Sequence, residues 1–293
     1  MACVSRRVLI GGAAAMMFVE RGRAGAPGRI ATADAALADL ARRSGGRLGV
    51  AAIDTGSGAR IGLAGHERFA MCSTFKVVLA AAILARVDRG ARRLEEAVAF
   101  GPADLLDHAP VVRAHLAEGR LPIGALCAAT IGQSDNSAAN LLLPLVGGPA
   151  GLTRFMRAAG DRVTRLDRGE PALNENIPGD ARDTTTPAAM LGLMRRLLLG
   201  RVLTPGSRTR LIGWMDAATT GTTALRAGLP STWRVGDKTG MGERGATNDI
   251  AIARPPGRAP ILIVAYASGS PQPVEARKAT LAAVGKIVAA AFA

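Results

Sequence analysis

The sequence predicts an α/β domain into which an all-helical domain is inserted. Strand-type segments lie near both ends of the chain, whereas the long middle is mostly helical in pattern. Strands from the two ends of a chain can share one sheet, and the segment between them then forms a separate helical layer. Each end also carries a helical pattern, which would cover this sheet.

The N-terminal part predicts a helix followed by a β-hairpin. Apolar residues recur with helical spacing from about Thr32 to Ser44. Two strands follow, Leu48–Asp54 and Ala59–Leu63. The residues between them, Thr-Gly-Ser-Gly, are typical of a hairpin turn.

The middle of the chain, from Ser73 to about Leu211, is predicted to be helical apart from one long loop. This loop, Arg165–Thr185, has weak periodicity, two prolines and many charges. Loops of this length in compact domains usually serve function. The expected helices are Phe75–Val87, Ile123–Ile131, Ala138–Val146, Gly151–Ala159 and Pro187–Leu199.

The C-terminal part returns to strands and ends in a helix. The strands are Trp233–Lys238, Asp249–Ala253 and Ile261–Tyr266, and the helix covers about Val274–Phe292. The predicted division is an α/β domain of residues 27–66 and 225–293, interrupted by an all-helical domain of residues 67–224 that includes the loop 165–185.

Residues 1–26 have the features of an export signal. Arg6 and Arg7 precede an apolar run over 8–19, and an Ala-Gly-Ala cleavage site follows at 24–26. Arg21 and Arg23 favour the twin-arginine route over the general one, although an ordinary secretory signal with two arginines is the alternative. We expect an exported protein, periplasmic or secreted, without stable membrane association, because no later segment reaches about 18 unbroken apolar residues.

Composition and charge exclude several functions. The 293 residues carry a formal net charge of +14, but the basic residues are scattered and aromatic residues make up only 3%. Stacking platforms for single-stranded nucleic acid are therefore not expected, and no nucleic-acid partner is predicted. The three cysteines and three histidines lack the spacing of a metal site, so neither a metal nor another cofactor is predicted.

The first candidate catalytic motif is Ser-x-x-Lys at Ser73 and Lys76. The apolar run after Ser73 is helical, so Lys76 would lie one turn later on the same face. A serine hydroxyl needs a nearby base or positive charge to act as a nucleophile. Taken alone, the motif is better explained by an N-cap serine and a solvated lysine.

Three further motifs follow along the chain. They are Ser134-Asp135-Asn136, the acid Glu170 with Asn174 four residues later, and Lys238-Thr239-Gly240. Each alone could be a helix cap, a surface acid or a strand end. Their combination and order are those of serine-acylating penicillin-recognising enzymes, and with Glu170 the sequence resembles a class A serine β-lactamase. The similarity runs from about Ala35 to the C-terminus and includes the omega loop 165–185.

The resemblance implies an architecture and an activity. The fold would be an α/β sandwich with a mostly antiparallel five-stranded sheet flanked by helices and an inserted all-α domain. The enzyme would be a monomer that hydrolyses the amide of a small-molecule β-lactam, in penicillins and some cephalosporins, and so gives antibiotic resistance. An ion pair between Arg168 and Asp183 would latch the omega loop, and the Glu170–Pro171 bond would be cis.

The resemblance also implies catalytic roles. Ser73 would attack the lactam carbonyl, and the backbone N–H groups of Ser73 and Met241 would form the oxyanion hole. Lys76, or Glu170 through a water, would take the serine proton. Ser134 would relay a proton to the leaving nitrogen, and Glu170 would activate the water that hydrolyses the acyl-enzyme. The residues implied in substrate binding are Asn136, Asn174, Lys238, Thr239, Gly240, Thr247, Arg277, His108 and Thr220.

The chain departs from the family pattern at several of these positions. Thr247 stands where many relatives have a carboxylate-binding arginine, and Arg277 in the last helix is expected to replace it. His108 takes the place of an aromatic gate residue. The bulk of Met241 weighs against a preference for cephalosporins. Positions that carry partner cysteines in some relatives are Ala80 and Gly242 here, so Cys72 and Cys127 are predicted to be free, buried thiols.

Three other classes of protein compete with this interpretation. A penicillin-binding peptidase shares the serine and lysine motifs but does not need Glu170 and Asn174. A penicillin sensor is acylated once, but usually carries a membrane segment and a signalling domain. A triad hydrolase would need a Gly-x-Ser-x-Gly motif, which the sequence lacks.

Overall fold

The computed structural model describes Met1 and residues 26–292. The predicted export signal falls almost wholly on residues 2–25, outside the described residues. At the centre is a five-stranded sheet with the order β2-β1-β9-β8-β7, in which all neighbours are antiparallel. Its strands are β1 (Arg47–Asp54), β2 (Arg60–Leu63), β7 (Arg234–Met241), β8 (Thr247–Arg254) and β9 (Ile261–Ser268).

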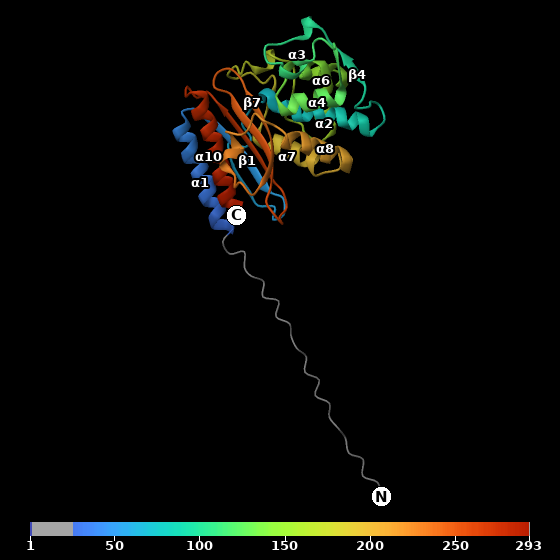
Figure 1. The fold of residues 1–293 in the computed structure, drawn as a ribbon. Helices are drawn as coiled ribbons and strands as arrows, with labels where there is room; N and C mark the ends of the chain where they lie inside the picture. Colours follow the sequence, from blue (N-terminus) through green and yellow to red (C-terminus); the bar gives the residue numbers. More distant parts are fainter. Residues whose placement is uncertain (2–25, 293) are drawn as a thin grey trace.

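Helices cover both faces of this sheet, as the sequence predicts (Figure 1). On one face, α1 (Ala26–Ser44) and α10 (Val274–Phe292) lie side by side. On the other face lies the helical part of the chain. Its helices are α2 (Phe75–Asp88), α3 (Pro110–Ala114), α4 (Ile123–Gly132), α5 (Asn136–Leu142), α6 (Gly148–Ala158), α7 (Pro187–Leu198) and α8 (Pro205–Asp216). The single turn α9 (Leu225–Gly228) instead packs against α10 on the first face.

The alternation of side chains along the strands separates two hydrophobic cores. In β9, Ile263 and Ala265 join the core beneath α1 and α10, whereas Val264 and Tyr266 join the core shared with the helical part. Successive residues of a strand point to opposite faces, so a strand buried on both sides reads as a continuous apolar run. This explains why the sequence of β9 is apolar throughout.

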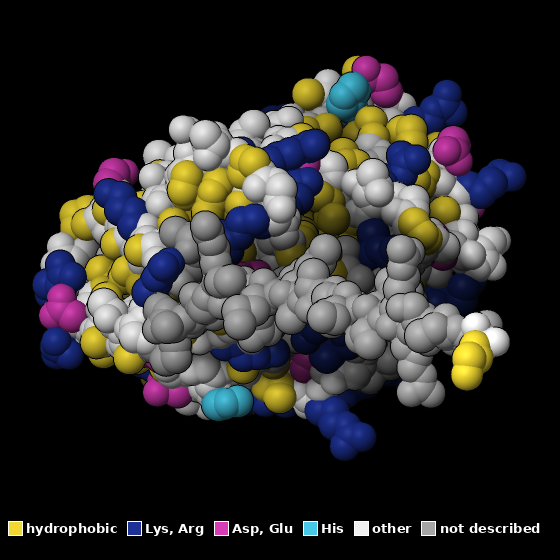
Figure 2. Space-filling view, turned by 90° about the horizontal axis from the view of Figure 1, so that it is seen from below, with side chains coloured by type: hydrophobic (Ala, Val, Ile, Leu, Met, Phe, Trp, Pro, Cys, Tyr) yellow, Lys and Arg dark blue, Asp and Glu magenta, His cyan; other side chains and the backbone are white. Residues whose placement is uncertain are grey.

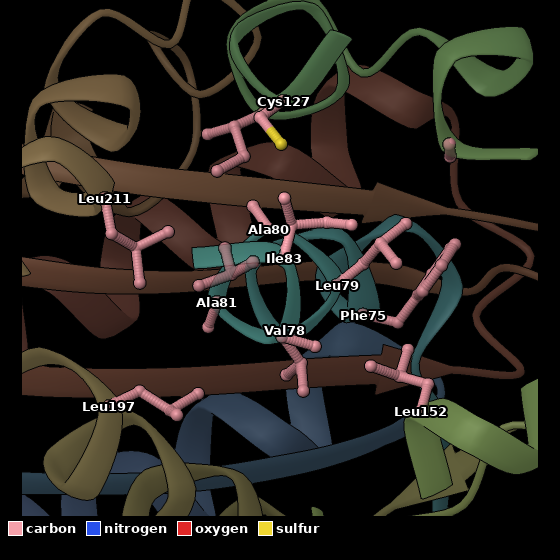
Figure 3. Close-up of a cluster of buried hydrophobic side chains, with 14 of the residues drawn as sticks. Phe75, Val78, Leu79, Ala80, Ala81, Ile83, Cys127, Leu152, Leu197 and Leu211 are labelled. Carbon is pink, nitrogen blue, oxygen red and sulfur yellow. The ribbon is translucent and has the colours of Figure 1, made fainter. Parts of the chain in front are cut away.

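Helix α2 is the central helix of the inserted part (Figure 3). Its side chains are buried from Phe75 to Ala85, which is typical of a helix surrounded by protein on all sides. Cys127 of α4, Leu152 of α6, Leu197 of α7 and Leu211 of α8 surround it. The only charged side chain in this buried stretch is Lys76, in the first turn, where the helix meets the sheet.

Two short pairings and several single turns fall outside the predicted elements. Strand β3 (Phe69–Ala70) pairs with β6 (Thr184–Thr185), and β4 (Ala97–Ala99) pairs with β5 (Arg120–Pro122). The predicted helix 138–146 is instead α5 followed by a 3₁₀ turn, Leu143–Val146. Pro144 lies in this turn and has no N–H to continue an α-helix. Other 3₁₀ turns are Cys72–Thr74, Pro102–Asp104 and Ala172–Asn174.

Cys72 and Cys127 are both free and buried, which confirms the prediction. Burial raises the pKa of the Cys72 thiol to about 12 and also raises that of Cys127. No group of residues suited to a metal ion occurs within 26–292. Within the same described range, no helix is long and apolar enough to cross a membrane.

Candidate active site

The serine and lysine of the first motif lie where the 3₁₀ turn Cys72–Thr74 leads into α2. Cys72 has a positive φ of 46°, which turns the chain sharply before Ser73. Ser73 is 8% exposed and Lys76 is fully buried. Both point to one carboxylate: the Ser73 hydroxyl donates to Glu170 Oε1 at 3.2 Å, and Lys76 Nζ lies 2.9 Å from the same oxygen.

The second motif lies directly beside Lys76. The Lys76 ammonium donates to the Ser134 carbonyl at 2.8 Å and to Asn136 Oδ1 at 2.5 Å. Ser134 Oγ lies 3.4 Å from Lys76 Nζ. Ser134 has a positive φ of 58°, uncommon for a residue other than glycine. The next residue, Asp135, caps α5 by accepting from the Ala138 N–H at 2.8 Å, so capping and site geometry occur together in this turn.

The third motif comes from strand β7. Lys238 is fully buried and donates to Ser134 Oγ at 3.0 Å and to the Thr239 carbonyl at 2.8 Å. At Gly240 the strand passes so near the nucleophile that an added Cβ would lie 3.2 Å from Ser73 N and 2.9 Å from the Met71 carbonyl oxygen. A glycine is therefore required at position 240, and the approach brings the following residue, Met241, to the rim of the site.

Both buried lysines have a lowered pKa. Burial and the positive charge of Lys76 lower the pKa of Lys238 to about 7, although Asp249 and Asp237 act in the opposite direction. Burial also lowers the pKa of Lys76, against the attraction of Glu170. Desolvation disfavours a charged ammonium, so both amines are nearer to neutrality than a surface lysine.

Glu170 is held by contacts to its backbone and to its side chain. Asn174 Nδ2 donates to Glu170 Oε2 at 2.6 Å, and Asn140 of α5 bonds the N–H and the carbonyl of Glu170 at 2.9 and 2.8 Å. The Glu170–Pro171 bond is cis, as predicted. The sequence analysis did not identify Asn140. A Cβ at Gly169 would lie 2.9 Å from Asn140 Oδ1, so the glycine leaves room for this clamp.

The predicted latch pair of the omega loop is present. Arg168 Nε lies 2.7 Å from Asp183 Oδ2, and Asp183 Oδ1 accepts from the N–H groups of Asp167 and Arg168 at 2.7 and 2.9 Å. Arg168 also pairs with Glu175 at 2.5 Å. The two ends of the loop are also joined through the backbone, because the Arg165 N–H donates to the Thr184 carbonyl at 3.0 Å. Strand β6, at the end of the loop, pairs with β3.

These residues open into a cavity of about 590 Å³. Its wall contains most of the predicted binding residues. Thr239 Oγ1 donates to Thr220 at 2.7 Å, Thr247 is almost fully buried, and Asn174 Oδ1 has no hydrogen-bond partner within the described residues. The lining includes Ser73, His108, Ser134, Asn136, Asn174, Thr220, Thr239, Met241, Thr247 and Lys278.

Arg277 does not line this cavity, whereas its neighbour Lys278 does, together with Leu281 one turn later. Successive residues of a helix point about 100° apart, because there are 3.6 residues per turn. Arg277 and Lys278 precede Leu281 by four and three residues, so both lie on the same side of α10 as Leu281. Arg277 Nε and Nη1 are buried without a hydrogen-bond partner within the described residues, so the expected role of Arg277 in binding the substrate carboxylate stays a prediction beside that of Lys278.

Known proteins are similar to this chain over nearly its whole length. The model of the beta-lactamase enzyme family matches residues 32–292. This chain belongs to that family. Beta-lactamase CTX-M-8 of Citrobacter amalonaticus is 47% identical over 252 residues, 86% of each chain, and beta-lactamase OXY-2 of Klebsiella oxytoca is 47% identical over 86% of this chain and 87% of its own.

Solved structures extend the similarity from the sequence to the fold. The class A β-lactamase of the last common ancestor of Gram-negative bacteria has 56% identity and a TM-score of 0.88, and covers 89% of this chain and 100% of its own. A β-lactamase from Xanthomonas campestris has 51% identity and a TM-score of 0.88, with 90% and 99% covered. The predicted fold class and the predicted family are thus confirmed.

Proposed function

We propose that this family member hydrolyses β-lactams through an acyl-enzyme on Ser73. One observation carries the proposal: the Ser73 hydroxyl and the Lys76 ammonium contact the same oxygen of Glu170, at 3.2 and 2.9 Å. A nucleophile, a buried amine and a carboxylate within hydrogen-bond reach can exchange protons during acyl transfer. Degradation of the antibiotic would give resistance to the cell that makes the enzyme.

In acylation, Ser73 attacks the lactam carbonyl and gives its proton to Lys76 or, through a water, to Glu170. The depressed pKa of Lys76 supports the first route, because a neutral amine can accept a proton. The backbone N–H groups of Ser73 and Met241 then bind the oxyanion. Each preorganised donor of this kind is worth about 3–4 kcal/mol in the transition state.

Collapse of the tetrahedral intermediate requires a proton on the lactam nitrogen. Ser134 is the donor in this proposal, because its hydroxyl accepts from Lys238 at 3.0 Å and lies 3.4 Å from Lys76 Nζ. Either amine can replace the proton that Ser134 gives away. The C–N bond of the lactam breaks, and the product remains as an ester on Ser73.

Deacylation is assigned to Glu170 and Asn174. The carboxylate accepts from Asn174 at 2.6 Å and lies beside the ester-forming oxygen of Ser73. A water held between them would lose its proton to Glu170 as it attacks the ester. A penicillin-binding peptidase does not need this pair, and this supports hydrolysis over cross-linking.

Substrate recognition is assigned to the cavity wall. Lys238, Thr239 and Gly240 would hold the substrate carboxylate together with Thr220, Thr247 and a cation from α10. Asn136 would bond the side-chain amide, and His108 and Met241 would line the mouth. Penicillins fit this proposal best, and only some cephalosporins are expected, because Met241, which is 43% exposed, adds bulk at the rim.

The test is to mix the enzyme with benzylpenicillin and to follow substrate loss and intact protein mass together. Rapid loss without a lasting adduct is the expected result. Ser73→Ala is the matched control and should give neither loss nor adduct. A stable adduct on Ser73 without turnover would instead identify a peptidase or a sensor.

Lys278→Ala is expected to lower kcat/KM for penicillins by about 10–100-fold, the value of one charge-assisted hydrogen bond. We predict a smaller effect for Arg277→Ala, because Arg277 is not part of the cavity wall, although its buried Nε and Nη1 have no partner within the described residues. The two variants remove the same charge from neighbouring positions, so each controls for the other. A larger effect for Arg277→Ala would restore Arg277 as the carboxylate-binding residue.

The rate should also depend on pH through Lys238. A lysine is charged below its pKa, and that of Lys238 is about 7. The charge that attracts the substrate carboxylate is therefore lost as pH rises, and kcat/KM should fall above about pH 7. Because a bound carboxylate raises this pKa, kcat should fall at a higher pH than kcat/KM. A flat kcat/KM from pH 6 to 9 would exclude Lys238 as the titrating group.

The remaining features of the proposal concern the protein as a whole. We propose export by the signal in residues 1–26, action as a monomer in the periplasm or outside the cell, and no stable membrane association. We also propose the division into an α/β domain of residues 27–66 and 225–293 and an all-helical domain of residues 67–224. The sheet strands β1, β2, β7, β8 and β9 all fall within the first of these.

A further inference from the structure

Two hollows lie behind the omega loop, away from the substrate cavity. Their volumes are about 440 and 590 Å³, and Arg68 lines both. The first is rich in arginine, but most of its arginines have carboxylate partners. These pairs are Arg47 with Glu67 at 2.8 Å, Arg168 with Asp183 at 2.7 Å, Arg182 with Asp180 at 2.6 Å and Arg244 with Glu243 at 3.1 Å.

The second hollow differs in its charge balance. It lies between α6 and the start of the omega loop, and its walls hold five arginines but only one acid, Asp167. Asp167 forms an ion pair with Arg165, at a distance of 2.6 Å. The other four have no carboxylate partner among the residues that the structure describes. They are Arg68, Arg154, Arg157 and Arg162.

The nearby acid Asp161 does not line the hollow, and within the described residues it forms no ion pair with these four arginines. It is buried, and its carboxylate accepts from the Val163 and Thr164 N–H groups at 2.8 and 3.0 Å and from the Thr164 hydroxyl. It therefore stabilises the turn that begins the loop. Its single negative charge lowers the positive potential of the hollow, but the four arginines without a carboxylate partner outnumber it.

Two of the arginines are held in place by hydrogen bonds to the backbone. Arg157 Nη1 donates to the carbonyls of Asp161 and Thr164 at 2.7 and 2.6 Å. Arg68 Nη1 donates to Val163 O at 3.2 Å and Thr184 Oγ1 at 2.9 Å. Fixed guanidinium groups cannot move apart to relieve their mutual repulsion, but they are preorganised for an anion.

The width of the hollow is fixed as well. Thr153 of α6 exchanges two hydrogen bonds with the backbone of Leu166, at 2.9 and 3.0 Å, and so ties the helix to the loop. By contrast, Lys and Arg side chains are spread over the whole visible part of the face shown in Figure 2. The hollow brings five arginines to the wall of one cavity.

We propose that this hollow is a binding site for a small multivalent phosphate anion of the diphosphate class. Guanidinium forks match phosphate oxygens two at a time, which favours phosphate over a monovalent anion. The site shares no lining residue with the substrate cavity. Its occupant would bridge α6 and the start of the loop that carries Glu170.

The test is to titrate the whole enzyme with inorganic pyrophosphate at constant ionic strength, by calorimetry and by thermal unfolding. We expect saturable binding and a rise in Tm. Arg154→Gln with Arg162→Gln should weaken binding by about tenfold or more, because each removes a charge-assisted contact. Arg201→Gln with Arg210→Gln, exposed residues at α8, is the control with the same change in charge and should bind as the wild type does.

Hydrolysis of penicillin by both double variants shows that they are folded. Equal weakening in the two double variants, or no saturable binding by the wild type, would overturn the proposal. A second arm uses vesicles of phosphatidylcholine and phosphatidylglycerol. If the enzyme binds the vesicles and pyrophosphate displaces it, the phosphate of the site comes from a lipid headgroup. If pyrophosphate leaves vesicle binding unchanged, the anion binds elsewhere on the enzyme, which contradicts this site.

Discussion

Glu170→Ala is expected to be acylated by benzylpenicillin and then to stall, with kcat lowered by about 10²–10⁴-fold, the usual contribution of a positioned general base. The reason is the proposed division of labour at Ser73. Lys76 remains beside the nucleophile in the variant and can accept its proton. No other carboxylate lines the substrate cavity in the described part of the chain to activate the hydrolytic water.

The measurement is intact protein mass at times from milliseconds to minutes after mixing. The expected species is a single adduct of the mass of the penicillin, which the wild type shows only transiently. Glu170→Gln keeps the shape of the side chain and should stall in the same way, and this separates loss of the base from loss of packing. Turnover at the rate of the wild type in either variant would remove Glu170 from the mechanism.

An unmodified protein would be equally informative. If Glu170→Ala neither turned over nor formed an adduct, Glu170 would be needed for acylation, and the route through Lys76 alone would be wrong. Asn174→Ala gives an intermediate case. It removes the 2.6 Å hydrogen bond to Glu170 Oε2 but keeps the carboxylate, so a smaller accumulation of adduct is expected.

The fold was predictable where local pattern and tertiary packing agree. Helix α10 begins and ends at the predicted residues, Val274 and Phe292. Strands β7 and β8 run further than predicted, to Met241 and from Thr247. These extensions contain polar residues that are buried by contact with the turn before α2, which no local pattern reveals. The two-residue strands β3 and β6 depend wholly on partners far along the chain.

The site was predictable to the extent that its residues occur in motifs. The serine and lysine motifs and Glu170 meet around Lys76 at hydrogen-bond distances, although each alone had a structural explanation. Asn140 was not identifiable, since it is a single amide in a short helix whose partner is 30 residues away. The sequence does not distinguish Arg277 from Lys278, because both lie on the same side of α10 as the buried Leu281.

Asp183→Asn is expected to destabilise the enzyme by about 3–5 kcal/mol, the cost of breaking a buried ion pair from one side. Asp183 is fully buried, and its carboxylate accepts from Arg168 Nε and from two backbone N–H groups, at 2.7, 2.7 and 2.9 Å. An amide cannot accept at both ends, so Asn leaves at least one buried donor without a partner. For a domain of this size Tm should fall by about 6–12 °C.

Glu175→Gln is the matched control, because Glu175 is the other carboxylate that contacts Arg168. Its side chain is 38% exposed, so solvent can replace the lost contact, and a small effect on Tm is expected. A comparable fall in Tm in the two variants would show that removing either negative charge beside Arg168 is equally destabilising. The latch would then have no special dependence on the burial of Asp183.

Asp183→Asn should also have a lower kcat than the wild type at temperatures where the variant is still folded. Asp183 joins the two ends of the omega loop, and Glu170 lies between them. Loosening the latch therefore increases the range of positions that the Glu170 carboxylate can occupy. A misplacement of about 1 Å can cost about 100-fold in rate. Deacylation should suffer and acylation should not, because Ser73 and Lys76 are held by α2 rather than by the loop. Accumulation of acyl-enzyme in Asp183→Asn is therefore the decisive readout, and equal slowing of both steps would assign Asp183 to stability alone.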